Sequence, residues 1–195
     1  MLANHLAPTA TTLVRMDHSH ALLTFRRYHA DTPMHLKRGL VDTVCLALEV
    51  HAQLEEEIFY PAVRAALPPG EVMDAAVADH DDMRRLIAEL RALAPDDPHR
   101  DTLFMTLMRE VLHHVADEET VVLPAAERLL KDELRPLGAR MLTRRAQLVA
   151  PRAGELANNL ARATPPSKWL LLAGAALTGL VLTQRRHGRH RSAAA

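Results

Sequence analysis

One eleven-residue pattern occurs twice in this chain, and it constrains the fold more than any other feature. HAQLEEEIFYP begins at His51 and HVADEETVVLP at His114, so a histidine, two glutamates and a proline recur at identical spacing, 63 residues apart. An Asp-His pair lies upstream of each copy, and these pairs are 62 residues apart: Asp17-His18 and Asp79-His80. The sequence is therefore expected to contain a duplicated unit.

Helical periodicity surrounds both copies. Apolar residues recur at spacings of three and four in four segments, 11–30, 33–67, 71–94 and 98–130. Thr32-Pro33 and Asp97-Pro98 are typical helix starts, and Pro68-Pro69-Gly70 and Pro95 are typical stops. Short connections make neighbouring helices antiparallel. We predict an all-α, up-down-up-down four-helix bundle over 11–130, with a helical C-terminal extension that ends in a short hydrophobic segment.

The composition supports this fold class. Hydrophobic residues make up 48% of the chain but aromatic residues only 3%, which suits helices rich in leucine and alanine. The single cysteine, Cys45, excludes an internal disulfide framework and any thiolate-rich metal site. A reducing, cytoplasmic setting is the expectation, because the first residues also lack the pattern of a signal peptide.

The duplicated residues have the chemistry of metal ligands. Residues four apart on an α-helix differ by about 40° around its axis, so His51 and Glu55 share one face, as do the corresponding residues of the second copy, His114 and Glu118. If the duplication is structural, His18 and His80 face inward from the other two helices. Buried carboxylates are very unfavourable unless they are paired or bind a cation. Two divalent metals satisfy that demand and leave at least one coordination position open.

The order His, HxxxE, His, HxxxE resembles that of hemerythrin HHE cation-binding domains, over about 120 of the 195 residues. This resemblance implies two iron ions, with manganese as the alternative, and two bridging glutamates. The implied ligands are His18, His51, Glu55, His80, His114 and Glu118. Oxygen-carrying hemerythrins have a further His and an Asp where this chain has Arg84 and Glu118. The resemblance therefore extends to binding or reacting with O₂, peroxide or nitric oxide, but not to reversible O₂ carriage.

Several neighbouring residues allow two interpretations. The register with His51 selects His114 over His113, which is a reserve candidate. Glu56 and Glu119 lie about 140° from the ligand face and are either solvated or support a ligand. Asp17 and Asp79 either orient a neighbour or lie on the surface. We expect Cys45 to be a small buried hydrophobe, Pro61 and Pro124 to kink their helices, and the unpaired histidines to lie at the surface: His20, His29, His35 and His99.

The C-terminal third differs in charge. Residues 1–130 hold 12 Lys and Arg against 21 Asp and Glu, a net charge of −9, whereas 131–195 hold 12 against 3, a net charge of +9. We expect a basic amphipathic connector over 131–166, which either meets a surface or packs on the bundle. A hydrophobic segment over 167–184 and a basic tail over 185–195 follow.

The hydrophobic segment predicts contact with a membrane. Its uncharged core, Trp169 to Thr183, would span about 22 Å as a helix, against about 30 Å of hydrocarbon, so a monotopic or re-entrant insertion fits better than a full span. A buried helix against a partner subunit is the alternative. Nucleic-acid binding is not expected, because no recognised fold or aromatic interleaving accompanies the arginines.

Three functions follow from the metal site. The leading one is a di-iron module, tethered at a membrane, that binds or senses O₂, nitric oxide, peroxide or iron. The first alternative is a di-iron enzyme that reduces peroxide or O₂, for which Tyr28 and Tyr60 are the phenolic proton donors available. The second alternative is a structural bundle that folds only with metal. The sequence does not fix the physiological ligand, the electron donor or the oligomeric state.

Overall fold

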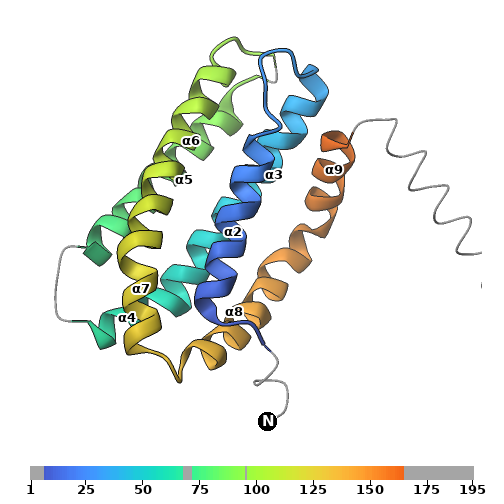
Figure 1. The fold of residues 1–195 in the computed structure, drawn as a ribbon. Coiled ribbons are helices and arrows are strands. Elements are labelled where there is room, and N and C mark those ends of the chain that lie inside the picture. Colours follow the sequence, from blue (N-terminus) through green and yellow to red (C-terminus); the bar gives the residue numbers. More distant parts are fainter. Residues whose placement is uncertain (1–6, 68–71, 95, 165–195) are drawn as a thin grey trace, which may run out of the picture.

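The computed structural model describes residues 7–67, 72–94 and 96–164, which are helical and contain no strand. Figure 1 shows the arrangement. In chain order the helices are α2 (Ala10–Phe25), α3 (Met34–Leu54), η1 (Glu55–Phe59), α4 (Tyr60–Ala66), α5 (Val72–Ala92), α6 (Arg100–Asp117), η2 (Glu118–Val122), α7 (Leu123–Leu129), α8 (Leu134–Val149), η3 (Ala150–Arg152) and α9 (Ala153–Ala163).

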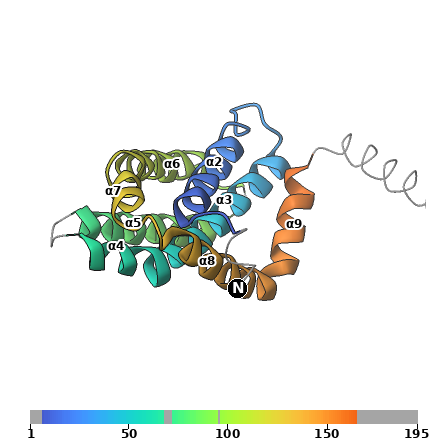
Figure 2. The same ribbon diagram turned by 60° about the horizontal axis from the view of Figure 1, so that its bottom comes forward.

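Four rods form the bundle. The rods are α2, the continuous run α3–η1–α4, α5, and the continuous run α6–η2–α7, and consecutive rods are antiparallel (Figure 1). The extension α8–η3–α9 lies along the outside, where α8 packs on α2 and α9 on α3 (Figures 1 and 2). The predicted all-α fold is confirmed.

The first helix is shorter than the predicted segment 11–30, because the chain turns after Phe25. The amides of Arg27 and Tyr28 donate to carbonyls only three residues back, which tightens the end of the helix. The hydroxyl of Thr32 then accepts from the backbone N–H of His29 at 2.9 Å, so it closes this turn and does not cap α3. Helical periodicity alone cannot locate such a turn, since local polar contacts decide it.

Two π-helical turns, η1 and η2, interrupt the two rods that carry the repeated pattern. Each comes directly before the residue that precedes a proline, Pro61 or Pro124. Proline lacks an N–H and its ring collides with the carbonyl four residues earlier. The amides of Tyr60 and Leu123 instead donate to the carbonyls of Glu55 and Glu118, five residues back. The wider turn accommodates each proline and begins at the duplicated glutamate.

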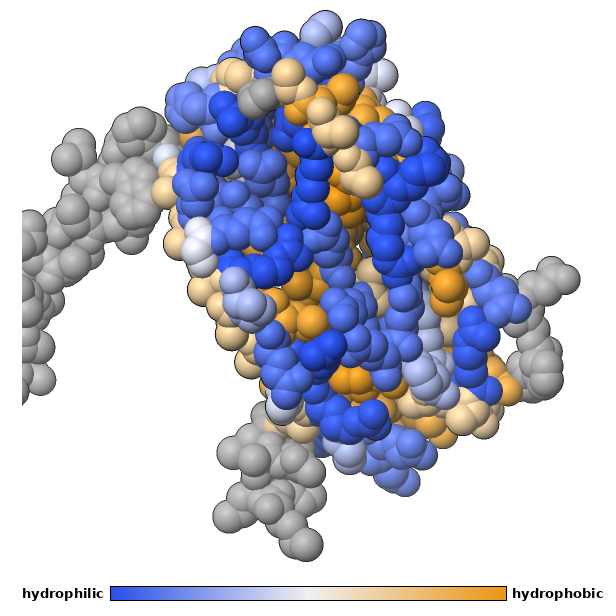
Figure 3. All heavy atoms as spheres, turned by 180° about the vertical axis from the view of Figure 1, so that it is seen from behind, coloured by the Kyte–Doolittle hydropathy of each residue, from blue (hydrophilic) through white to orange (hydrophobic). Residues whose placement is uncertain are grey.

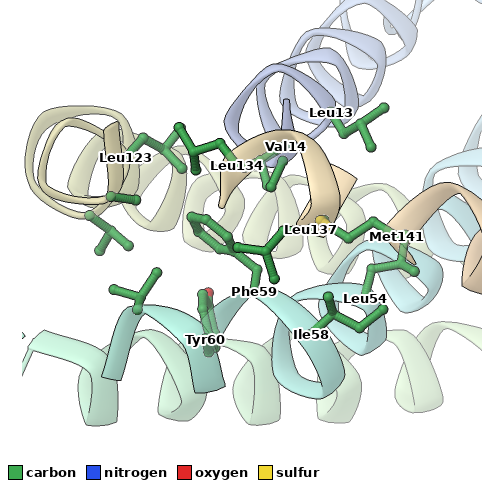
Figure 4. Close-up of a cluster of buried hydrophobic side chains, with 14 of the residues drawn as sticks. Leu13, Val14, Leu54, Ile58, Phe59, Tyr60, Leu123, Leu134, Leu137 and Met141 are labelled. Atoms are coloured by element: carbon green, nitrogen blue, oxygen red, sulfur yellow. The ribbon is translucent and has the colours of Figure 1, made fainter. Parts of the chain in front are cut away.

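The interior is layered. One hydrophobic cluster includes Val14, Leu54, Phe59 and Leu123, and Figure 4 shows that it also receives side chains from α8. A second cluster fills the other half of the bundle and contains Val44, Leu86, Leu90, Phe104, Leu107 and Met108. All four rods pass from one cluster to the other, and the buried histidines and glutamates lie at the boundary. The polar layer therefore sits in the middle of an apolar interior.

The extension is part of the folded unit. Leu134, Leu137 and Met141 of α8 are each 5% exposed or less and belong to the first cluster. At the other end, α9 crosses α3 so closely that a Cβ atom on Gly39 would lie 2.4 Å from the backbone nitrogen of Ala163. Elsewhere the surface is more polar: the face in Figure 3 is mostly hydrophilic, with separate hydrophobic areas.

The sequence-based expectation of a membrane segment falls on residues 167–184, which lie outside the described residues. Within the part of the chain that the structure describes, no helix combines the length and the apolar character that crossing a bilayer requires.

The contact at Gly39 yields a stability prediction. Gly39→Ala should lower the free energy of unfolding by about 1–3 kcal/mol, because the new methyl group meets backbone atoms of α9 that cannot move aside. Gly154→Ala is the matched control, since nothing lies within 4 Å of the Cβ it would add; it should change stability by less than about 1 kcal/mol. Urea unfolding followed by circular dichroism measures both. Equal stability of the two variants would contradict the close packing of α9.

Candidate metal centre

The structure brings the six predicted ligands together in the middle of the bundle. His18 comes from α2, His51 from α3, His80 from α5 and His114 from α6, while the glutamates open the two π-helical turns. All six are almost fully buried, with exposed fractions of 4% or less: His18, His51, Glu55, His80, His114 and Glu118.

Their polar atoms converge on one small space. Glu55 Oε2 lies 3.1 Å from His51 Nε2 and 3.4 Å from His80 Nε2. Glu118 Oε2 lies 3.2 Å from His18 Nε2 and 3.4 Å from His114 Nε2. Two overlapping groups each have ligand atoms within 4.8 Å of one another: His18, His51, His114 and Glu118, and His51, Glu55, His80 and His114. The histidines at 51 and 114 are common to both groups, so the two groups form one centre.

The outward nitrogen of every histidine faces an acid. The Nδ1 atoms of His18 and His80 lie 3.0 and 2.9 Å from carboxylate oxygens of Glu119 and Glu56. The Nδ1 atoms of the other two histidines lie 3.5 Å from two aspartates, in the pairs His51–Asp17 and His114–Asp79. An acid at Nδ1 favours the tautomer with its proton there and leaves the Nε2 lone pair directed inward. Glu119 and Glu56 therefore orient His18 and His80 through hydrogen bonds. Asp17 and Asp79 place a carboxylate beside the Nδ1 atoms of His51 and His114, which form no hydrogen bond at these longer distances.

Arginines hold three of these acids in place. Arg15 Nε donates to Glu119 at 2.9 Å, and Arg84 donates to Glu56. Arg145 of α8 pairs with both oxygens of Asp17, at 2.6 and 2.5 Å. The carboxylate of Asp17 is desolvated, but its contacts with His51 and Arg145 outweigh that effect and lower its pKa to about 2. Asp17 therefore stays ionised beside His51 and Arg145.

Tyr60 also reaches the centre. Its buried hydroxyl donates to Glu118 Oε1 at 2.7 Å, lies 3.2 Å from Glu55 Oε2, and its ring stacks on that of His80 at 5.5 Å. The sequence offers Tyr60 as a possible proton donor but does not predict this position, because on a regular α-helix Tyr60 would point about 140° away from Glu55. The π-helical turn brings residues five apart onto one face. The signal in the sequence was the proline that follows it.

Because water does not reach this site, burial and neighbouring charges shift the pKa values of its glutamates and histidines. Burial and the neighbouring charge of Glu118 raise the pKa of Glu55 to about 8. Burial would also raise the pKa of Glu118, but the contact with His18 and the charges of His114 and His51 lower it. Burial lowers the pKa values of His80 and His114. His80 and His114 are thus kept neutral and Glu118 ionised, which are the forms that bind metal, whereas at His18 burial lowers the pKa but the contacts with Glu118 raise it above its usual value.

Several buried polar atoms of the site have no hydrogen-bond partner, and their chemistry shows whether a metal would fit. His18 Nε2, His51 Nε2, Glu55 Oε1 and Glu118 Oε2 are buried and have no hydrogen-bond partner. Buried polar atoms are nearly always paired, and an unpaired set that points at one place is the donor set a cation completes. Imidazole and carboxylate donors without thiolate suit iron, manganese or zinc. The residues present therefore fit a metal centre.

The other candidate residues lie away from this centre. The other five histidines of the described residues are all exposed: His20, His29, His35, His99 and His113. Cys45 is 2% exposed, and burial raises the pKa of its thiol to about 12, so it is a buried apolar side chain, as expected. The choice of His114 over His113 agrees with this geometry.

A helical bundle with buried imidazoles and carboxylates facing one space defines a class of protein, the metal-binding helical bundles. Comparison with known proteins names the family. The sequence profile of the hemerythrin HHE cation-binding domain matches residues 9–126, and the chain belongs to that family.

Two individual proteins are similar. A hemerythrin HHE cation-binding domain-containing protein from Mycobacterium kansasii has the same fold, with a TM-score of 0.64 and 19% identity, over 80% of this chain and 99% of that one. A DNA nickase from Nostoc sp. (strain PCC 7120) is 26% identical over 121 residues, which are 62% of this chain and 34% of the nickase. The chain therefore matches about a third of that protein.

The raised pKa of Glu55 predicts how the stability of the metal-free protein varies with pH. The unfolded chain releases this proton near pH 4.5, but the folded protein keeps it until about pH 8, so rising pH favours unfolding across that interval. Below about pH 6.5 the unfolded chain gains protons on histidines that are buried when folded, which acts in the opposite direction. We therefore expect the free energy of unfolding to fall by about 1–2 kcal/mol from pH 6.5 to 8.

Chemical denaturation of the metal-free protein at several pH values measures this slope. Glu55→Gln removes the titrating group and should flatten the curve in that interval. An unchanged slope in the variant would contradict the assignment.

Proposed function

We propose that the chain binds two iron ions between the four histidines and two glutamates, with manganese as the alternative. The observation that carries this proposal is the pair of glutamates, 0% and 1% exposed, among the inward nitrogens of four histidines. Two ions match the two overlapping ligand groups, because one group contains Glu118 and the other contains Glu55. Membership of the hemerythrin HHE family favours iron.

The function best supported is the binding or sensing of a very small uncharged ligand such as O₂ or nitric oxide. A small cavity of about 10 Å³, enough for about one water molecule, lies against His18, His51 and His114. Small apolar side chains complete its lining, namely Ala21, Ala47, Leu48, Val111 and Val115, with Asp17 at one side. When bound, the metals would supply an open coordination position and electrons. The protein itself orients the candidate ligands, and the size of the cavity excludes larger molecules.

A second candidate is an enzyme that reduces peroxide or O₂, and Tyr60 favours it. Its hydroxyl holds a proton 2.7 Å from Glu118, and burial beside the two glutamates raises the pKa of the phenol, so the proton stays on Tyr60 Oη. Because a raised pKa makes the phenol a weak acid, this proton would pass only to a strongly basic oxygen atom, such as a reduced one. Multiple turnovers of peroxide with an electron donor would favour this candidate; reversible spectral changes favour binding.

The DNA-nicking activity of the Nostoc protein is not carried over to this chain, because the matched region is only about a third of that nickase.

Metal analysis and ligand mixing test the leading proposal. Protein loaded anaerobically with Fe(II) should hold two metals per chain and bind nitric oxide in stopped-flow absorbance. Ala47→Leu narrows the cavity and should slow association at least about tenfold at unchanged metal content. Ala88→Leu is the matched control, because Ala88 is exposed on α5 and should leave the rate unchanged.

Two results would count against the proposal. A metal content well below two per chain after loading would contradict the di-iron centre, and equal rates for both leucine variants would contradict the cavity as the ligand site.

We also propose that residues 167–184 tether the bundle at a membrane, in a cytoplasmic setting. This proposal rests on the uncharged apolar sequence and the arginines after it. Deleting residues 165–195 should move the protein from the membrane fraction to the supernatant while its metal content stays the same. Unchanged fractionation would refute the tether.

A further inference from the structure

Asp17, one of the four acids beside the candidate ligand histidines, is paired with an arginine that lies outside the four-helix bundle. Arg145 of α8 forms two parallel bonds to Asp17, from Nη1 to Oδ1 at 2.6 Å and from Nη2 to Oδ2 at 2.5 Å. The same Oδ2 atom lies 3.5 Å from His51 Nδ1. Arg145, Asp17 and His51 thus lie in series, from the extension to a candidate ligand that both groups of the centre share, and the contact between Asp17 and His51 is a close charge contact without a hydrogen bond.

The other acids are held differently. Glu119 is paired with Arg15 of α2, and Glu56 with Arg84 of α5, so both cations come from within the bundle. Asp79 faces the negative charges of Asp82, Asp117 and Glu110. Arg145 lies beyond residues 9–126, which match the family profile. The support of His51 is therefore a property of this chain's extension.

The pair is built to fix orientation. Its two parallel bonds lock the plane of the carboxylate, which a single contact to a lysine would not do. The side chains of Arg145 and Asp17 are 30% and 16% exposed, so solvent screens the pair only partly. Burial of Leu137 and Met141 of α8 in the core fixes the helix that carries Arg145. A docked α8 therefore sets the position of Asp17.

We propose that Arg145 is a positioning residue of the metal centre, through which the α8–α9 extension orients His51. With Arg145 in place, Asp17 faces His51 Nδ1 and the imidazole presents Nε2 to the metals. Without it, the carboxylate is free to turn towards solvent and His51 loses the negative charge that faces its Nδ1 atom. Outer partners of this kind change metal affinity by roughly 10–100-fold. This inference rests on the proposed metal binding.

The adjacent residue provides a matched control. Arg144 lies on the same helix and also pairs with both oxygens of one acid, Glu57, at 2.6 and 2.9 Å. Glu57 is on the surface and contacts none of the candidate ligands through a described bond. Arg144→Met therefore removes a similar ion pair from α8 without touching the centre.

The experiment compares metal retention in the full chain. Protein loaded with Fe(II) is mixed with excess colorimetric chelator, and Co(II)-loaded protein provides a visible ligand-field spectrum. Arg145→Met should release metal at least about tenfold faster and shift the Co(II) bands. Arg145→Lys, which keeps the charge but not the two-point contact, should fall between, and Arg144→Met should match the wild type.

A double-mutant cycle distinguishes the loss of this one contact from a general destabilisation of the protein. Asp17→Asn alone should accelerate metal release, and adding Arg145→Met to it should change the rate less than twofold, since both act through one contact. Release from Arg145→Met within twofold of that from Arg144→Met would overturn the inference while leaving metal binding intact. A wild-type protein that retains no metal would overturn both. If Arg145→Met does not fold, Arg145→Lys and Asp17→Asn carry the same comparison.

Discussion

Two carboxylates are buried close together in the interior of this bundle, and the rest of the structure depends on how their charges are compensated. Glu55 and Glu118 are essentially inaccessible to solvent, and apolar clusters lie on both sides of their layer. Neither charge can be solvated there, so the protein must either protonate one of them or surround both with cations. The four imidazoles, their outer acids and the arginines that pair with three of those acids favour the second outcome.

The duplicated sequence explains the symmetry of the centre, and single substitutions explain where the symmetry fails. Each half provides an Asp-His pair and an HxxxEE motif, and each histidine receives its outer acid from a different helix. The two halves differ at the residue after the π-helical turn, which is Tyr60 in the first and Leu123 in the second. They differ again at the outer aspartates, because Arg145 pairs with Asp17. Two metals in this centre would thus have unequal surroundings.

The extension changes what counts as the functional unit. Its first helix contributes apolar side chains to the core below the metal layer, and its last helix packs on α3 through Gly39 (Figures 2 and 4). A bundle cut at residue 130 would expose that core and leave Asp17 without its arginine. Binding chemistry and the C-terminal helices are therefore coupled through packing, whatever the role of the residues that follow.

The sequence by itself determined the helical fold, the duplication and the six candidate ligands. Helical periodicity and motif spacing are local properties that can be read directly along the chain. It left open the roles of Asp17, Asp79, Glu56 and Glu119, and it could not position Tyr60. Only the tertiary structure decided these, since each depends on a contact between distant segments or on a π-helical turn that rotates the chain. The support of His51 by Arg145 joins residues 94 positions apart. Proximity of that kind arises from packing of the extension, which no local pattern records.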